Sequence, residues 1–121
     1  IGLYQKPLEF LDEKIHEQLI HILKLLATKL LRREFSDNPE TLLNLIMSLK
    51  KEIHHSNLLK IHVCLEDFQN LQDIIQDKSL LEQLEVDENL QTGDVWMSSD
   101  TSTLHALLEE RINELLKTSS Q

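Results

Sequence analysis

Apolar residues recur along the first third of the chain with a helical period. They follow one another at steps of 3, 4, 4, 3, 4 and 4 residues, a spacing that keeps them on one face of a helix. Pro7 stands where a first helical residue belongs, so the pattern predicts a helix over Leu8–Glu34, about 40 Å long. The stripe consists of Leu8, Leu11, Ile15, Leu19, Ile22, Leu26 and Leu30.

A second apolar stripe joins the first from Ile20 onward. The first half of the helix therefore offers the narrow seam that a coiled-coil partner covers, and the second half the broad face that a globular core covers. The second stripe consists of Ile20, Leu23, Ala27 and Leu31. We therefore predict the end of a dimerising stalk over residues 1–19, a globular domain over 20–117 and a disordered tail over 118–121. Because the chain begins with Ile1, we expect it to be a fragment.

The remaining pattern predicts an α+β fold with the element order ααβαββα. Asn38 and Pro39 begin a second helix, which an alternating segment follows as the first strand. Three short strands would form a small mixed sheet packed by the helices, with the first two parallel and the last two joined as an antiparallel hairpin. The expected elements after the first helix are Pro39–Ile53, Lys60–Cys64, Glu66–Ile75, Leu84–Val86, Asp94–Ser98 and Thr101–Leu116.

Charge and composition exclude several classes of function. The net charge of −9 argues against nucleic acid as a partner, while a basic protein partner fits. No apolar run approaches the ~18 residues of a membrane span, so we expect no direct membrane insertion. With two glycines in the chain, the glycine-rich phosphate loops cannot be built, and the single Cys64 fits a reducing, cytoplasmic compartment.

Candidate chemistry is sparse. His54, His55, His62 and Cys64 are metal-ligand types, but their spacing matches no standard site, so we expect no catalytic residue, metal or other cofactor. The alternative from another class is a small metal-dependent enzyme using His62 and Cys64. Trp96 alternates with residues that would face the helices, which would make it an exposed anchor for a partner; packing under the long helix is the other possibility.

Two segments, together with the element order, resemble a known family. They are Arg32–Leu43 (RREFSDNPETLL) and Leu84–Trp96 (LEVDENLQTGDVW). They look like the C-terminal domain of the flagellar assembly protein FliH, a domain shared with stator proteins of type III secretion injectisomes. The resemblance extends more remotely to the E subunit of rotary ATPases, and a peripheral-stalk subunit of that type is the alternative within the binding class.

The resemblance implies a non-enzymatic stator of type III protein export. Such proteins form homodimers, bind the N-terminal region of the export ATPase, and link it to the cytoplasmic ring through an N-terminal part absent from this chain. They work at the cytoplasmic face of the inner membrane. The dimer seam would consist of Leu8, Leu11, Ile15, Leu19 and Ile22. The contact with the ATPase would use Trp96, Glu109, Glu110 and Glu114.

Overall fold

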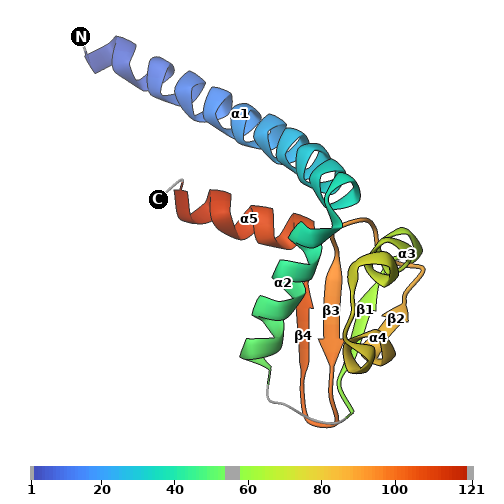
Figure 1. Cartoon of the computed structure of the whole chain (residues 1–121). Helices are drawn as coiled ribbons and strands as arrows, with labels where there is room; N and C mark the ends of the chain where they lie inside the picture. The colour runs from blue at the N-terminus through green and yellow to red at the C-terminus, as the bar shows by residue number, and fades with distance from the viewer. Residues whose placement is uncertain (1, 54–57, 120–121) are drawn as a thin grey trace.

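The computed structural model describes residues 2–53 and 58–119, and the side chains of residues 12–53 and 58–117. A long helix, α1 (Gly2–Asp37), projects from a small α+β domain as an arm, and the last helix, α5 (Leu108–Ser119), lies beside it (Figure 1). The predicted long helix is confirmed, but it begins before Pro7, which lies inside it. No helix of the described segments combines the length and apolar character that crossing a bilayer requires.

The α+β class is confirmed, with four strands instead of three. The sheet order is β2-β1-β3-β4, and β1 pairs in parallel with β2 and antiparallel with β3, which pairs antiparallel with β4. The strands are β1 (Lys60–Val63), β2 (Leu84–Val86), β3 (Val95–Ser98) and β4 (Thr103–Ala106).

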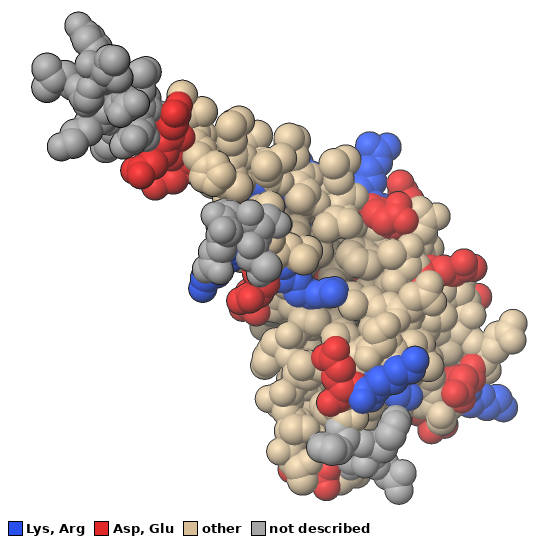
Figure 2. All heavy atoms as spheres, turned by 90° about the vertical axis from the view of Figure 1, so that its left-hand side faces the viewer, with Lys and Arg blue, Asp and Glu red and all other residues tan. Residues whose placement is uncertain are grey.

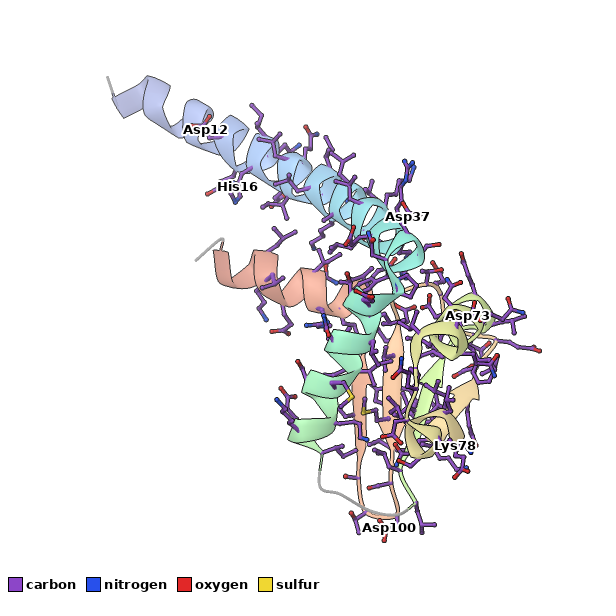
Figure 3. The ribbon with its side chains drawn as sticks, in the orientation of Figure 1. Asp12, His16, Asp37, Asp73, Lys78 and Asp100 are labelled. Atoms are coloured by element: carbon purple, nitrogen blue, oxygen red, sulfur yellow. The ribbon has the colours of Figure 1, made fainter. Side chains whose placement is uncertain are left out.

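The additional strand, β4, stands where the sequence predicted the start of the last helix. The hydroxyl of Ser99 accepts hydrogen bonds from the amides of Thr101 (3.3 Å) and Ser102 (3.1 Å), and the Ser99 amide donates to the Ser102 carbonyl (2.8 Å). These residues therefore close a turn between β3 and β4 instead of capping a helix. Asp100 marks this turn at the end of the sheet away from α1 (Figure 3).

The predicted hairpin of the second and third strands is wrong, because β1 lies between β2 and β3. β1 and β3 are the two inner strands, and both are buried on the core side: Ile61 and Val63 of β1 are fully buried, as are Val95 and Met97 of β3. The connection from β1 to β2 holds α3 (Leu65–Ile74) and a short helix, α4 (Lys78–Gln83), that the sequence analysis did not predict. Asp77 caps α4 by accepting from the Ser79 amide (3.0 Å).

One face of the sheet forms the core, and the helices α2 (Pro39–Glu52), α3 and α4 cover it (Figure 1). Strand alternation sends Val95 and Met97 into this core together with Ile46 of α2 and Leu71 of α3, all four fully buried. The opposite face carries the polar and aromatic residues of the same strands, and these remain available for contacts outside the domain.

Candidate functional site

The apolar stripe of α1 faces away from the domain. Ile15, Leu19 and Ile22 are each about half exposed, and Leu26 (53%) and Leu30 (67%) continue the exposed line beside the domain. Figure 2 shows uncharged atoms dominating this helix between the acidic residues near its N-terminal part and the domain. Such an exposed apolar line marks an interaction surface. The side chains of Leu8 and Leu11 lie outside the described residues.

The face of α1 that meets the domain is narrower than the second stripe suggested. Ala27 packs against the core and Phe35 is buried in it, whereas Leu23 and Leu31 remain exposed. Arg32 adds a polar contact with the domain, and Thr28 lines the hollow between α1 and α5. The domain therefore holds α1 by its C-terminal part and leaves most of its apolar surface uncovered.

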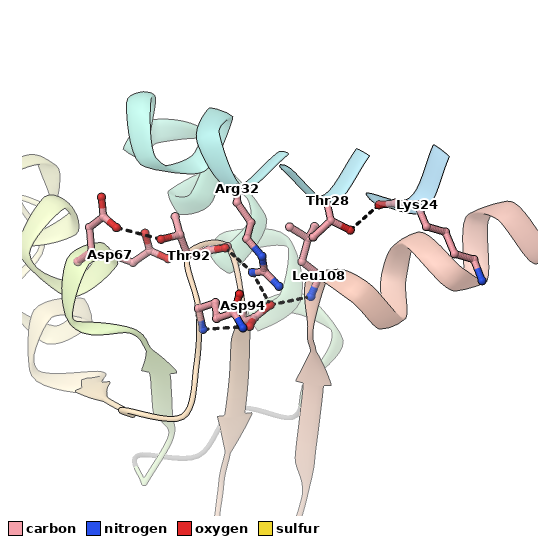
Figure 4. Close-up of polar contacts among 10 residues, drawn as sticks. Lys24, Thr28, Arg32, Asp67, Thr92, Asp94 and Leu108 are labelled. Atoms are coloured by element: carbon pink, nitrogen blue, oxygen red, sulfur yellow. Dashed lines mark hydrogen bonds and ion pairs between the residues drawn. The ribbon is translucent and has the colours of Figure 1, made fainter. Parts of the chain in front are cut away.

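A partly buried ion pair joins the arm to the domain (Figure 4). The Arg32 guanidinium lies 3.2 Å from Asp94 Oδ1 and also donates to the Thr92 carbonyl (2.7 Å). Asp94 additionally accepts from the amides of Leu108 (2.9 Å), the first residue of α5, and Gln91 (3.0 Å). One carboxylate thus joins α1, the β2–β3 connection and the N-terminus of α5. Its negative charge there interacts favourably with the positive end of the helix dipole.

The end of α1 packs against a tight turn at Gly93, in the connection between β2 and β3. Gly93 has φ +91°, and a Cβ there would lie 2.6 Å from the Phe35 ring. The Gly93 amide donates to Oδ2 of Asp67 (2.8 Å), a carboxylate that is 1% exposed. Burial raises the pKa of Asp67, and the Glu66 and Asp94 carboxylates add to this, against the Gly93 and Cys64 hydrogen bonds.

The open face of the sheet carries one row of side chains across all four strands. The register aligns Glu85 of β2, His62 of β1, Trp96 of β3 and His105 of β4. The His62 ring stacks on Trp96 at a centroid distance of 3.6 Å, and His105 stacks on Trp96 at 5.5 Å. The indole Nε1 donates to Asp87 (2.9 Å). Trp96 therefore lies on the face opposite the helices, flanked by two imidazoles.

Burial and neighbouring charges have opposite effects on the pKa of His62. Its Nε2 lies 3.2 Å from the Ser98 hydroxyl and its Nδ1 3.8 Å from Glu85, which Lys60 approaches to 3.1 Å. Burial lowers the pKa of His62, and this exceeds the upward effect of the Glu85 and Asp87 carboxylates. The hydrogen bond from Trp96, and then that from the Asn89 amide, lower the pKa of Asp87.

The predicted acidic contact residues fall on two sides of α5. Glu110 and Glu114, one turn apart, line a hollow with His105, and the hollow is about 370 Å³ in volume. Arg111 and Asn113 complete its lining. His105 also stacks on Trp96, so it links the two glutamates of this hollow to the aromatic row, while Trp96 itself does not line the hollow. Glu109 lines a different hollow, which lies between α1 and α5 and is about 180 Å³ in volume.

The candidate metal ligands serve other contacts. Cys64 follows β1 and is buried, where its sulfur accepts from the Asp67 amide (3.4 Å) at the start of α3, and burial raises its pKa. His62 is stacked on Trp96, so the two side chains do not act as a pair. Among the described residues, no group of three or more His, Cys, Asp or Glu could hold a metal ion. His54 and His55 lie outside the described residues.

A small α+β domain at the end of a helical arm, with exposed apolar and polar surfaces, defines a protein-interaction domain. The family model of the flagellar assembly protein FliH matches residues 1–115, so the chain belongs to the FliH family. This confirms the resemblance inferred from the two segments and assigns the chain to a family of non-catalytic proteins of flagellar assembly and type III export. No curated protein matches the chain.

Sequence reasoning missed the residues that fix the arm and flank the tryptophan. Arg32 and Asp94 are 62 positions apart, and no local pattern pairs them. The positions of His62 and His105 on the open face could have been predicted from the sequence. Both residues alternate with inward-facing residues of short strands, as Trp96 does. Recognising the row would have required the sheet order, which placed β1 and β4 on either side of β3.

Proposed function

We propose that this chain is the ATPase-binding domain of a stator in a flagellar type III export apparatus. Membership of the FliH family supports this role, and so does the shape of the molecule, a domain held at a fixed angle on a long helical arm. In this proposal the domain binds the N-terminal region of the export ATPase. The arm leads toward an N-terminal part that attaches to the cytoplasmic ring, at the cytoplasmic face of the inner membrane.

The arm pairs with a second copy of the chain. Residues 1–19 form the end of this stalk and residues 20–117 the domain, with Leu8, Leu11, Ile15, Leu19 and Ile22 in the seam. The exposure of Ile15, Leu19 and Ile22, each about half, supports this pairing, since a coiled-coil partner would cover such a line. Fully burying an exposed Leu or Ile side chain contributes about 1.5 to 3 kcal/mol, so covering these half-exposed side chains in both copies would favour the dimer.

The ATPase contact is centred on the hollow of His105, Glu110 and Glu114 beside Trp96, and Glu109 would join it from the side of α5 that faces α1. This hollow is the observation that carries the contact, because it combines two carboxylates on one face of α5 with the edge of the aromatic row. A segment rich in Lys or Arg is the complementary partner, given the net charge of −9. An interfacial tryptophan adjoining such charges is a typical hot spot.

Binding to the purified export ATPase, measured by titration calorimetry, tests this contact. Reversing Glu110 and Glu114 to Lys should weaken binding by roughly a hundredfold, because charge pairs at interfaces contribute several kcal/mol. Asp73→Lys on α3, at the far side of the sheet from α5 (Figure 3), is the matched control and should leave binding unchanged. Equal affinities for the parent, the double reversal and Trp96→Ala would overturn the proposed contact.

A further inference from the structure

We propose that the hollow between the start of α3 and the β2–β3 connection is a second docking site, whose occupant is a short segment of another protein that carries Lys or Arg side chains beside an apolar one. This hollow lies apart from the one beside His105, because α3 and α5 stand on opposite sides of the domain in the view of Figure 1. The inference goes beyond the proposed ATPase contact and does not depend on it.

The position of the hollow follows from the topology of the sheet. β1 and β2 are the parallel pair, α3 begins shortly after β1, and the connection to β3 begins directly after β2. The carboxyl ends of both strands therefore open at the same edge, the place where open α/β sheets commonly bind their ligands. The hollow there is about 440 Å³ in volume, within the range of about 300 to 1,000 Å³ that is usual for binding pockets.

Apolar side chains line part of this hollow. Leu65, the first residue of α3, is 56% exposed, and Leu90 of the connection is partly buried. An apolar side chain of a partner would cover Leu65 and remove its exposed surface from water, which favours binding. The hollow therefore suits one apolar side chain of a partner segment.

Three carboxylates surround these leucines, namely Glu66 at the start of α3 and Asp87 and Glu88 in the connection. No Lys or Arg is among the described residues that line the hollow, and no ion pair within the described part of the chain reaches any of the three carboxylates. Like charges around one hollow repel one another, and a cation supplied by a partner would relieve this repulsion. Charge complementarity therefore favours a basic partner.

Neutral donors hold two of the carboxylates in place without cancelling their charge. Glu66 accepts from the hydroxyls of Ser36 (2.7 Å) and Thr92 (3.0 Å), one at each oxygen. Asp87 accepts from Nε1 of Trp96 (2.9 Å) and, at its other oxygen, from the amide two residues further on (2.9 Å). These bonds lower the pKa of both carboxyl groups, so both are ionised at neutral pH. Each oxygen has a second lone pair, so both groups are preorganised to accept from an ammonium or guanidinium group.

An NMR titration of the isotope-labelled chain tests the site. The probe is a blocked pentapeptide of alternating arginine and leucine. We expect chemical-shift changes at the amides of Leu65, Glu88 and Thr92, and at the indole N–H of Trp96, which Asp87 links to the hollow. Peptides with glutamate in place of arginine, or serine in place of leucine, should bind roughly tenfold more weakly or worse.

Two substitutions test the charged and the apolar part of the site separately. Glu88→Lys and Leu65→Gln should each weaken binding of the arginine–leucine peptide roughly tenfold. Both side chains are exposed, so the fold should be retained, which circular dichroism checks. Glu82→Lys is the matched control, because it makes the same charge change at an exposed glutamate of α4, before β2 and thus at the other end of that strand. It should weaken binding less than about twofold.

Several results would overturn the site. Shift changes centred on His105, Glu110 and Glu114 would place the basic segment at α5 and leave the proposed ATPase contact intact. Equal weakening by Glu88→Lys and Glu82→Lys would show only a general attraction to the net charge. Equal binding of the glutamate peptide would show that the carboxylates do not select the partner. No shift change at millimolar peptide would remove the docking site altogether.

Discussion

Phe35 and Gly93 meet where α1 ends, and neither can change without moving the other. The positive φ of Gly93 disfavours any side chain, and the added Cβ would lie 2.6 Å from the Phe35 ring. We expect Gly93→Ala to lower the free energy of unfolding by about 2 to 4 kcal/mol, the sum of a strained backbone and an overpacked contact. Urea denaturation followed by circular dichroism measures this.

A double-mutant cycle separates the two causes at Gly93. In a Phe35→Leu background the steric part should shrink, so Gly93→Ala should cost about 1 to 2 kcal/mol less than in the parent chain. An identical cost in both backgrounds would mean that the Phe35 ring moves aside freely, and that backbone strain alone explains the glycine.

His62 should make the stability of the sheet depend on pH. Burial lowers its pKa in the folded state, so between the ordinary value of 6.5 and this lower value the unfolded chain binds a proton that the folded chain does not. The free energy of unfolding therefore falls as the pH drops through this window and is regained as it rises. Since Trp96 is the only tryptophan, its fluorescence should report protonation of the stacked ring, with a midpoint below 6.5. His62→Gln should abolish this transition, and persistence of the same transition in His62→Gln would show that His62 is not its source.

At the scale of the element, α5 depends on a cap that comes from outside it. Asp94→Ala removes the acceptor of the Leu108 amide and the partner of Arg32, so we expect a loss of about 3 kcal/mol in unfolding free energy. Hydrogen exchange should accelerate in α5 more than in α2. Asp37→Ala is the matched control, because it breaks an exposed ion pair with Arg33 and should cost about 0.5 kcal/mol or less. Equal effects of both substitutions would show that the Asp94 junction does not hold α5.

The same junction shows why some elements were predictable and others were not. Periodicity sufficed for α1 and α2, because a long apolar stripe is a local signal. Pro39 correctly marked the start of α2, whereas Pro7 misplaced the start of α1, which begins at Gly2. The four residues of β4 are too few for alternation to stand out among Thr and Ser residues, which equally suit a helix cap. The true cap of α5 is Asp94, fourteen residues upstream, a relation that exists only after folding.

At the scale of the whole molecule, the order of the strands in the sheet determines which residues lie beside Trp96. Sequence spacing left two positions open for Trp96, and the structure places it on the face of the sheet opposite the helices. It did not predict that β1 and β4 would flank β3 and place His62 and His105 on the indole. The acidic residues of α5 were predicted as one group, yet the helix divides them between the hollow beside His105 and the hollow beside α1.

The distribution of charge leads to a prediction about kinetics. A domain with a net charge of −9 that binds a basic segment should attract it over distances comparable to the Debye length, about 10 Å at 0.1 M salt. Between about 50 and 500 mM NaCl we expect the association rate constant with the export ATPase to fall tenfold or more, with little change in the dissociation rate. Stopped-flow fluorescence of Trp96 measures both rates. Glu110→Lys with Glu114→Lys should flatten the salt dependence, and Asp73→Lys should flatten it much less. A rate independent of salt would show that apolar contact, and not the acidic hollow, brings the partners together.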